Sequence, residues 1–346
     1  MVVSRFRHYG FMGVELFDIA EAAEEDLRSV HRVVLAAQAV DRPDEVPVTF
    51  EALVGSMRTP PAGFGPRRYW VVRRDGGIVA VAFVNLPDAE NGHLALVTIT
   101  VHPRLRRRGI GTAFLRDLLP RLEGRPVVEG WEITSGGAGE HWAVSVGFRV
   151  VNTMVLQLLP VAEVDRSTWD VAVPAGYRVE DWVGAAPDAL LESFARARNA
   201  LRDAPFGEID FQAPLWTGDR VREAEADLRA RGVEQRMVVA VHEESGDVVG
   251  VTEVEVRPHR PHWASQRETS VLGAHRGHGL GRCIKAHMAR RLLTDRPDIE
   301  RFYTTTSADN THMIRVNEAI GYRTVRTQVS VKQDVTVLAA HPRVLG

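Results

Sequence analysis

The sequence has a single cysteine, Cys283, among its 346 residues. One thiol cannot form an intrachain disulfide, and a chain without disulfides is typical of a reducing compartment. The sequence also lacks any apolar run near the roughly 20 residues that span a bilayer. Its first residues lack the apolar core and the cleavage site of a secretory signal. We therefore expect a cytoplasmic protein that does not enter a membrane.

Charge of one sign is not in excess, because 43 basic side chains are balanced by 45 acidic ones, for a net charge of −2. This balance gives no general electrostatic reason to expect a nucleic acid or an anionic membrane as a partner. The hydrophobic fraction of 45% and the charged fraction of 25% are typical of globular proteins. A chain of this length is long enough for two domains, each with its own core.

The chain contains an internal repeat with an offset of 170 residues. One copy begins at Thr98 and reads TITVHPRLRRRGIGTAFLRDLL, and the other begins at Glu268 and reads ETSVLGAHRGHGLGRCIKAHMARRLL. Beyond each Arg/Gly loop, apolar residues recur every four positions, which is one face of a helix. These residues are Ile110, Phe114, Leu118 and Leu122 in the first copy, and Leu280, Ile284, Met288 and Leu292 in the second. The chain therefore contains two related units.

Each copy predicts the order strand, loop, helix, strand, short helix, strand. In the second copy these elements are expected near residues 263–272, 280–294, 299–307, 310–320 and from Tyr322 onwards, with Asn310 as the N-cap of the short helix. In the first copy the short helix is expected at 138–146 and the last strand at 149–158. We expect a first domain at residues 1–160, a linker at 161–174 and a second domain at 175–346.

The pattern Arg-x-x-Gly-x-Gly between a strand and a helix suits a pyrophosphate. Glycines let the backbone approach closely, so that several N–H groups point at one anion, and the following helix adds the positive end of its dipole. Arginine side chains add charge-assisted donors that match phosphate. The residues expected to bind it are Arg106, Arg107, Arg108, Gly109, Gly111 and Thr112 in the first loop, and Arg276, Gly277, His278, Gly279, Gly281 and Arg282 in the second.

A loop of this kind could also be purely structural, or could belong to a different nucleotide-binding fold. A tight strand-to-helix turn with a solvated basic surface would explain either loop alone, but not its recurrence in the same context. A dinucleotide fold requires G-x-G-x-x-G followed by an acidic residue after the next strand, and a nucleoside-triphosphate loop requires Gly-Lys-Ser/Thr. The two loops match neither pattern.

The stretches VHPRLRRRGIGTAF and GAHRGHGLGRCIKAHM resemble motif A of the GNAT superfamily of N-acetyltransferases, which binds acyl-coenzyme A. NTHMIRVNEAIGYR and the shorter HWAVSVGFRV resemble a later helix of that family. The tandem arrangement is similar to that of two-domain actinobacterial members, and the resemblance covers essentially the whole chain. It implies two α/β domains, each with a mixed sheet (α+β) that splays after its fourth strand, and acetyl-CoA as the acyl donor.

The resemblance also implies cofactor contacts beyond the loops. The pantetheine arm would pair with the backbone of the splayed strand, around Ile99 and Val101 in the first half and around Val271, Leu272 and Gly273 in the second. A backbone N–H near Leu272 is expected to stabilise the oxyanion, and Asn310 is expected to reach the cofactor near its thioester. The family often has a tyrosine general acid four residues before the glycine of the later helix. This chain has Asn317 and Ala143 there, so the acid stays unassigned.

Acetyl transfer to an amine requires a base that removes a proton from an ammonium group. The second half has Glu268 on the splayed strand, and Glu253 and Glu255 on one face of the preceding strand. The first half has Thr98 in the place of Glu268 and no acid on its preceding strand. Each glutamate alone also fits a solvated strand position, but together they favour the second half as the catalytic one. We expect Cys283 to be packed rather than nucleophilic, and the histidines form no metal-binding pattern.

We therefore predict an N-acetyltransferase that moves an acetyl group from acetyl-CoA to the amine of a small-molecule acceptor by direct, base-assisted attack, without a metal. The alternative is a coenzyme A-binding regulatory or structural protein without turnover. The segment 198–210, in which Asp203-Ala204-Pro205 breaks a helix, is either a lid near the acceptor, lined by Arg202, Asp203 and Phe206, or an ordinary loop.

Overall fold

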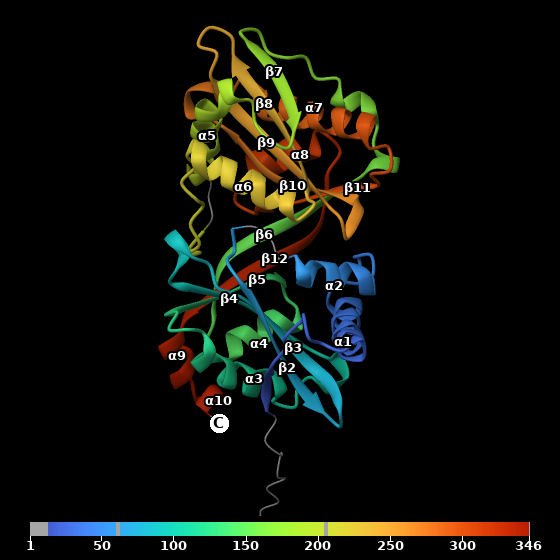
Figure 1. Cartoon of the computed structure of the whole chain (residues 1–346), viewed down its shortest axis with the longest axis vertical. Helices are drawn as coiled ribbons and strands as arrows, with labels where there is room; N and C mark the ends of the chain where they lie inside the picture. Colours follow the sequence, from blue (N-terminus) through green and yellow to red (C-terminus); the bar gives the residue numbers. More distant parts are fainter. Residues whose placement is uncertain (1–12, 60–62, 204–206, 346) are drawn as a thin grey trace, which may run out of the picture. The chain divides into compact units, whose positions relative to one another are not determined.

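The structure is a computed structural model that describes residues 13–59, 63–203 and 207–345 (Figure 1). The chain divides into two compact units. Unit 1 comprises residues 1–60, 64–149 and 331–346, and unit 2 comprises residues 61–63 and 150–330. Each unit has a mixed sheet with helices packed on it, which confirms the predicted α/β class and the tandem repeat. Among the described residues, no helix has both the length and the apolar character needed to cross a bilayer.

Unit 1 has the strand order β1-β2-β3-β4-β5, followed by the end of β12. Neighbouring strands from β1 to β4 are antiparallel, and β4 and β5 are parallel. Its strands are β1 (Val14–Leu16), β2 (Arg67–Arg74), β3 (Gly77–Asn85), β4 (Leu94–Val101) and β5 (Val127–Thr134). Its helices are α1 (Glu24–Asp41), α2 (Phe50–Arg58), α3 (Ile110–Leu118), α4 (Ala138–Ser145), α9 (Val335–Ala340) and α10 (Pro342–Leu345).

Unit 2 has the order β6-β11-β10-β9-β8-β7, with the first part of β12 beyond β6. The β10–β11 pair is parallel, and the pairs from β7 to β10 and the β11–β6 pair are antiparallel. Its strands are β6 (Arg149–Pro160), β7 (Tyr177–Val183), β8 (Glu234–His242), β9 (Val248–Arg257), β10 (Arg260–Val271), β11 (Arg301–Ser307) and β12 (Arg323–Asp334). Its helices are α5 (Leu191–Asn199), α6 (Gly218–Ala230), α7 (Leu280–Asp295) and α8 (Thr311–Glu318).

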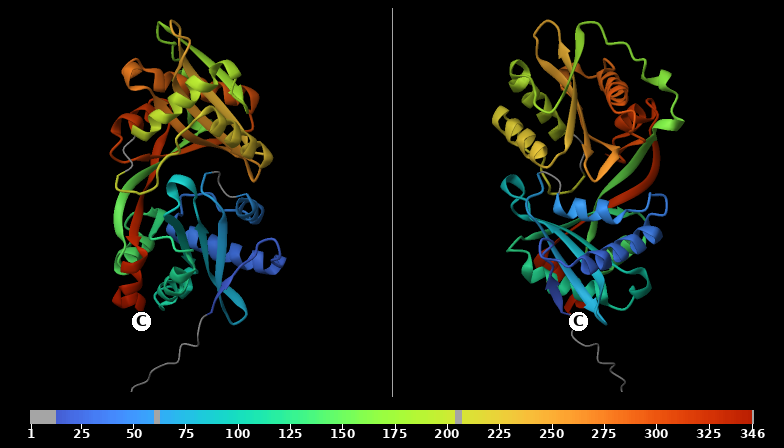
Figure 2. Two further views of the ribbon diagram at one scale, coloured as in Figure 1. Left: turned by 60° about the vertical axis from the view of Figure 1, so that its left-hand side comes forward. Right: turned by 45° about the vertical axis from the view of Figure 1, so that its right-hand side comes forward.

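Helices cover both faces of the unit 2 sheet. Successive side chains of a strand point to opposite faces, and β8 divides accordingly. Val238 and Ala240 belong to the core under α7, whereas Met237 and Val239 belong to the core under α5 and α6. The two views of Figure 2 show α5 and α6 on one side of these strands and α7 on the other. The four apolar residues predicted to form the stripe of α7 are all 1% exposed or less, which accounts for the position of this helix.

The parallel strands of each unit separate after a short stretch. Strands β10 and β11 are in register only at Trp263–Ser265, and β4 and β5 only at Leu94–Leu96, as far as the described strands are concerned. Thr304 of β11 still donates from its hydroxyl to the carbonyl oxygen of Gln266 at 3.2 Å, and beyond this contact residues 267–271 of β10 have no paired residue of β11 within the described strands. This splay of the sheet is what the family resemblance implies.

A β-bulge distinguishes β10 from its counterpart in unit 1. The register of β9 and β10 shifts between Gln266 and Thr269, so that Arg267 and Glu268 of β10 oppose the single residue Glu253 of β9. The pairing of β3 with β4 is regular throughout. Because a bulge redirects the side chains of its strand, two of the predicted catalytic glutamates meet at this irregularity.

The boundaries of the two compact units differ from those of the predicted domains. The first domain was expected to end at residue 160 and the second to begin at residue 175. Residues 150–160 of β6 pair with β11 in unit 2, and the end of β12 lies in the sheet of unit 1. The predicted linker at 161–174 includes Trp169, which is 1% exposed and donates from Nε1 to the carbonyl oxygen of Ile320 at 2.8 Å. The segment 161–174 is therefore packed against unit 2 at Trp169.

Candidate functional site

The strand-to-helix loop of unit 2 has an open backbone. Gly277 and Gly279 have φ values of +83° and +79°, in the left-handed region that favours glycine. A Cβ placed on Gly277, Gly279 or Gly281 would meet no other atom within 4 Å among the described residues. The free N–H groups of the first turn of α7 follow directly after Gly279. The loop thus offers backbone donors with space in front of them, which is the arrangement that an anion requires.

Four side chains hold this loop in place. Arg276 donates from Nε to the carbonyl oxygen of Val271 at 3.0 Å. The hydroxyl of Tyr177 and Nδ1 of His275 are 3.0 Å apart, and Nδ1 of His278 lies 3.1 Å from the carbonyl oxygen of Arg276. The loop is therefore held from the side of β7, and His278 turns back onto it.

The loop of unit 1 is occupied by side chains of its own unit. Both terminal nitrogens of Arg106 pair with the two carboxylate oxygens of Asp41 at 2.7 and 2.6 Å. A Cβ on Gly111 would lie 3.5 Å from the ring of Trp142, whose Nε1 donates to the hydroxyl of Thr112 at 3.2 Å. Three of the predicted cofactor residues thus have partners within the unit.

The backbone of unit 1 otherwise follows that of unit 2. Gly109, with a φ of +78°, precedes α3 as Gly279 precedes α7, but Arg107 takes the place of Gly277 and has a φ of +62°. A non-glycine residue in the left-handed region of φ costs about 1–2 kcal/mol. The unit 1 loop therefore keeps the backbone geometry of the unit 2 loop although Arg107 disfavours it. Arg108 continues the loop, and Ile99 and Val101 pair with β3 on the side away from the splay.

Two predicted catalytic glutamates share one arginine in unit 2. Nη2 of Arg198 lies 3.1 Å from Oε2 of Glu253 and 3.0 Å from Oε2 of Glu268, and its Nε donates to the same Glu268 oxygen at 3.1 Å. The side chains of Arg198 and Glu253 are 5% and 4% exposed, whereas that of Glu268 is 21% exposed. Oε1 of Glu253 accepts from Gln235 at 2.5 Å. Of the pair, only Glu268 reaches solvent.

The charges around Glu253 shift the pKa of its carboxyl in opposite directions. Burial raises the pKa of the Glu253 carboxyl and outweighs the opposite effect of Arg198, and the neighbouring Glu268 and Glu255 raise it further. Glu255, the third predicted glutamate, pairs instead with Arg257 at 2.6 Å and Arg267 at 3.6 Å. Glu255 therefore forms its own ion pairs with arginines of β9 and β10.

Arg198 was missed as a functional candidate. It lies four residues after Phe194, on the stripe of α5 that packs on the sheet, and an arginine on a buried stripe requires a charged partner. Its guanidinium stacks on the ring of Trp216 at 3.6 Å. The neighbouring Asn199 accepts from the Trp216 N–H at 2.8 Å and donates to its carbonyl oxygen at 3.0 Å. The end of α5 thereby fixes the segment 207–217.

Helix α5 ends at Asn199 and the 3-10 turn Ala200–Asp203 follows it. The other two residues of the predicted helix break, Ala204 and Pro205, lie outside the described residues. Arg202 donates to the carbonyl oxygen of Ala213 at 2.6 Å, so its guanidinium holds the same segment as Asn199. Phe206 lies outside the described residues.

The remaining predicted positions have structural partners. Leu272 donates its N–H to the carbonyl oxygen of Val249 at 2.9 Å, so this N–H already has a partner within the unit. Asn310 caps α8 as predicted, with Oδ1 accepting from the Met313 N–H at 3.1 Å. Asn317 is buried and donates to Oε1 of Gln157 at 2.7 Å. Burial raises the pKa of the Cys283 thiol, which keeps it protonated and unreactive.

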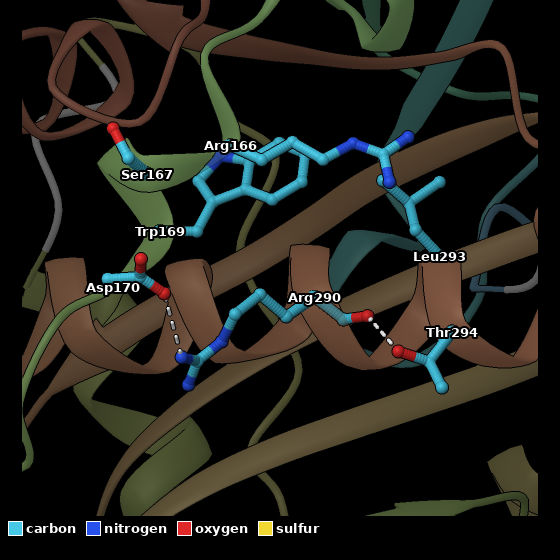
Figure 3. Close-up of a pocket in the computed structure, with 7 residues that line it drawn as sticks. All are labelled: Arg166, Ser167, Trp169, Asp170, Arg290, Leu293 and Thr294. Atoms are coloured by element: carbon cyan, nitrogen blue, oxygen red, sulfur yellow. Dashed lines mark hydrogen bonds and ion pairs between the residues drawn. The ribbon is translucent and has the colours of Figure 1, made fainter.

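A surface pocket of unit 2 lies beside the last turns of α7 (Figure 3). Its lining residues are Arg166, Ser167, Trp169, Asp170, Arg290, Leu293 and Thr294. Arg290 is ten residues after the first residue of α7, and at 1.5 Å per residue this is about 15 Å from the glycine loop. The pocket is therefore separate from the loop and from the carboxylates. The described residues contain no group of three or more His, Cys, Asp or Glu side chains that could hold a metal ion.

Comparison with known proteins agrees with the repeat and with the loops. The family model "Acetyltransferase (GNAT) family" matches residues 23–135 and 198–322. A mycothiol acetyltransferase of Mycolicibacterium vanbaalenii is 27% identical over 276 residues, which cover 76% of this chain and 82% of that protein. One of Sanguibacter keddieii is 27% identical over 322 residues, which cover 90% of this chain and 95% of that protein. The two matched segments confirm the tandem layout, which is similar to that of mycothiol synthase.

A solved structure has the same arrangement over nearly its whole length. It is described as a tandem GNAT protein from the clavulanic acid biosynthesis pathway, without AcCoA. The similarity has a TM-score of 0.74 and 26% identity, and covers 94% of this chain and 98% of the other. The GNAT protein of Sphaerobacter thermophilus has the same fold, with a TM-score of 0.70 and 16% identity.

Proposed function

Because this chain belongs to the acetyltransferase (GNAT) family, we propose that unit 2 transfers an acetyl group from acetyl-CoA to the amine of a small molecule. The observation that carries the proposal is the combination, within one unit, of an open glycine loop and a partly exposed glutamate beside a splayed strand. Gly279 and Gly281 supply the open loop, and Glu268 supplies the carboxylate. Unit 1 has the loop without the carboxylate.

The loop of unit 2 fits the pyrophosphate of the donor. Its three glycines leave the space that a Cβ would fill, and α7 adds its N-terminal N–H groups. The residues that would hold the donor are Arg276, Gly277, His278, Gly279, Gly281 and Arg282 of the loop, Val271, Leu272 and Gly273 before it, and Asn310 of α8. Acetyl-CoA supplies an acetyl group activated as a thioester.

Glu268 is the proposed general base. An aliphatic amine with a pKa of about 10 arrives as an ammonium ion, and its nitrogen has no lone pair for attack until one proton leaves. Oε2 of Glu268 is bound by Arg198, and Oε1 has no hydrogen-bond partner among the described residues. The proton passes to Oε1, and the neutral amine can then attack the acetyl carbonyl carbon. The C–N bond forms and the C–S bond of the thioester breaks, and the coenzyme A thiolate leaves with the second proton that the nitrogen releases. Glu253, enclosed by Arg198 and Gln235, is a support for this carboxylate rather than a second base.

Unit 1 has a structural role in this proposal. Thr98 takes the position of Glu268, and the regular pairing of β3 with β4 lacks the bulge found at Glu268. Asp41 and Trp142 occupy groups of the loop that a pyrophosphate would use. The splay of β4 from β5 is retained, so the fold is preserved while the groups for proton transfer are absent.

The test measures thiol release from acetyl-CoA with a panel of primary amines between pH 6 and 9.5. We expect Glu268→Gln to reduce kcat/KM by about 10²–10⁴-fold, with the largest loss at low pH where the amine is most protonated. Glu244→Gln is the matched control, because Glu244 is exposed in the β8–β9 turn. A Glu268→Gln profile identical to that of the parent protein would remove Glu268 from the mechanism. Tight coenzyme A binding without release for any amine would favour the alternative of a non-catalytic protein.

A further inference from the structure

The buried guanidinium of Arg198 forms ion pairs with the two carboxylates at the bulge. It lies 3.1 Å from Glu253 on β9 and 3.0 Å from Glu268 on β10, and its own side chain is 5% exposed. An ion pair removed from water is stable only if its geometry and its remaining hydrogen bonds are good. The arrangement therefore requires that each member of the group be held in place.

Arg198 is held on the side away from the carboxylates. Its guanidinium lies 3.6 Å from the centre of the Trp216 ring, within the range of a cation–π contact. Trp216 is itself fixed, because both its N–H and its carbonyl oxygen bond to the side chain of Asn199. Arg198 and Asn199, two consecutive residues of α5, thus both contact Trp216, and Trp216 limits the movement of Arg198.

The two carboxylates are bound differently. Both oxygens of Glu253 are used, Oε1 by Gln235 and Oε2 by Arg198. Within the part of the chain that the structure describes, Glu268 uses only Oε2, which accepts from both Nε and Nη2 of Arg198. The guanidinium therefore fixes Glu268 through one oxygen and leaves the other oxygen, on the partly exposed side chain, available to a proton donor.

We propose that Arg198 is the positioning residue of the active site, which binds Oε2 of Glu268 and turns Oε1 towards the acceptor amine. Glu253 and Trp216 hold Arg198 in the orientation that this requires. The proposal rests on the proposed role of Glu268 as the base. A lysine could not replace this arginine, because an ammonium group is a point charge without the planar fork that contacts Glu268 and Glu253 together.

Other charged groups lie near Arg198, Glu253 and Glu268, and they determine which charges remain there when Arg198 is replaced. Glu255 on β9 and Arg267 on β10 also act electrostatically on Glu253, and they are paired with each other at 3.6 Å. Removing Arg198 therefore takes away the cation in direct contact with Glu253 and Glu268, while Arg267, paired with Glu255, remains near them. The ionised form of Glu268 would lose its counter-charge, and the rate would begin to fall at a higher pH.

The test compares Arg198→Gln and Arg198→Lys with the control Arg196→Gln. Arg196 lies on the same helix and pairs at the surface with Asp247, and its side chain is 60% exposed. We expect Arg198→Gln to lower kcat by about 10²-fold, the usual result of displacing a catalytic group by about 1 Å, and to move the acid limb of the pH–rate profile to higher pH. Arg198→Lys should lower kcat about tenfold and leave that limb in place, because the charge is retained. The KM for acetyl-CoA should stay unchanged in all three variants, since the glycine loop is intact.

Arg198→Gln removes the cation that contacts the buried Glu253 and the partly exposed Glu268, and could prevent folding. Arg198→Gln/Glu253→Gln removes one of these carboxylates as well, and gives a second protein in which the acid limb can be measured. If either folded protein has the kcat and the pH profile of the parent, Arg198 does not position the base, while an effect of Glu268→Gln would leave the proposed function intact. If Glu268→Gln is also without effect, both proposals are overturned.

Discussion

Replacing Lys285 with leucine should stabilise unit 2 at neutral pH. Lys285 is 2% exposed in α7, and its ammonium lies 5.3 Å from the centre of the Tyr322 ring. Burial lowers the pKa of this lysine from 10.5 to about 7. The position corresponds to Leu115 of α3, which is 1% exposed, so the leucine variant copies the residue found at the same place in unit 1.

The size of the effect follows from the pKa of Lys285. The difference between 10.5 and about 7, at 1.36 kcal/mol for each pH unit, corresponds to about 5 kcal/mol. Above pH 7 the folded protein loses the proton while the unfolded chain keeps it up to pH 10.5, so stability rises with pH in this window. Below pH 7 both states carry the proton and the folded protein bears the full cost of burying it. The variant should therefore exceed the parent by about 5 kcal/mol at pH 6 and by about 2 kcal/mol at pH 9.

Urea unfolding of the full chain at pH 6 and pH 9, followed by tryptophan fluorescence, measures this difference. The control is Arg290→Leu, because Arg290 is an exposed residue of the same helix, with a side chain that is 45% exposed. An exposed ion pair contributes about 0–1 kcal/mol, so this control should change stability little and to the same extent at both pH values. Two results would contradict this reasoning: a Lys285→Leu protein less stable than the parent, or a gain in unfolding free energy that is equal at pH 6 and pH 9. Either result would show that a contact other than the cation–π pair with Tyr322 stabilises the buried ammonium.

Two further predictions concern glycines. Gly281→Glu should abolish coenzyme A binding to unit 2, because the added carboxylate would enter the open space in front of the loop. Gly111→Glu, whose side chain would meet Trp142, should instead destabilise unit 1 and leave coenzyme A binding to unit 2 in place. Calorimetry of coenzyme A binding to both variants separates the two loops, and an unchanged affinity in Gly281→Glu would contradict the assignment of the loop. Gly321→Ala should lower the free energy of unfolding by roughly 2–4 kcal/mol, because φ is +102° and the added Cβ would lie 2.7 Å from Val164. Gly246→Ala, at φ +72° with open space around the added Cβ, should lower it by only about 1 kcal/mol in the same urea unfolding assay. Equal losses in the two variants would exclude the contact with Val164 as the cause.

The elements around the loops could be predicted from the sequence because local patterns determine them. The stripe from Leu280 to Leu292 has helical spacing, and α7 begins at Leu280 as predicted. Asn310 was identified as an N-cap because its short polar side chain can accept from the third N–H beyond it, and it does. The splay of the sheet came from the family resemblance, since no local pattern specifies where two parallel strands separate.

The partners of the glutamates could not be predicted in the same way. Arg198 and Glu268 are 70 residues apart, and their contact depends on how α5 packs across β9 and β10. The bulge that places Glu268 opposite Glu253 has no glycine or proline to indicate it. Likewise, whether β6 joins the sheet of unit 1 or that of unit 2 depends on pairing across the fold, because the strand has the same alternating pattern in either sheet.

Asp41 shows why two similar loops need not indicate two active sites. It is the last residue of α1, where the negative end of the helix dipole disfavours a carboxylate, and the last turn contains no basic residue that would offset it. The position is explained by Arg106, whose guanidinium receives both of its oxygens. An arginine held in this way joins α1 to the β4–α3 loop and stabilises the unit without any ligand. The motif can therefore persist in unit 1 for its contribution to folding, and we expect turnover to depend on the unit in which the loop is open and a glutamate lies beside it.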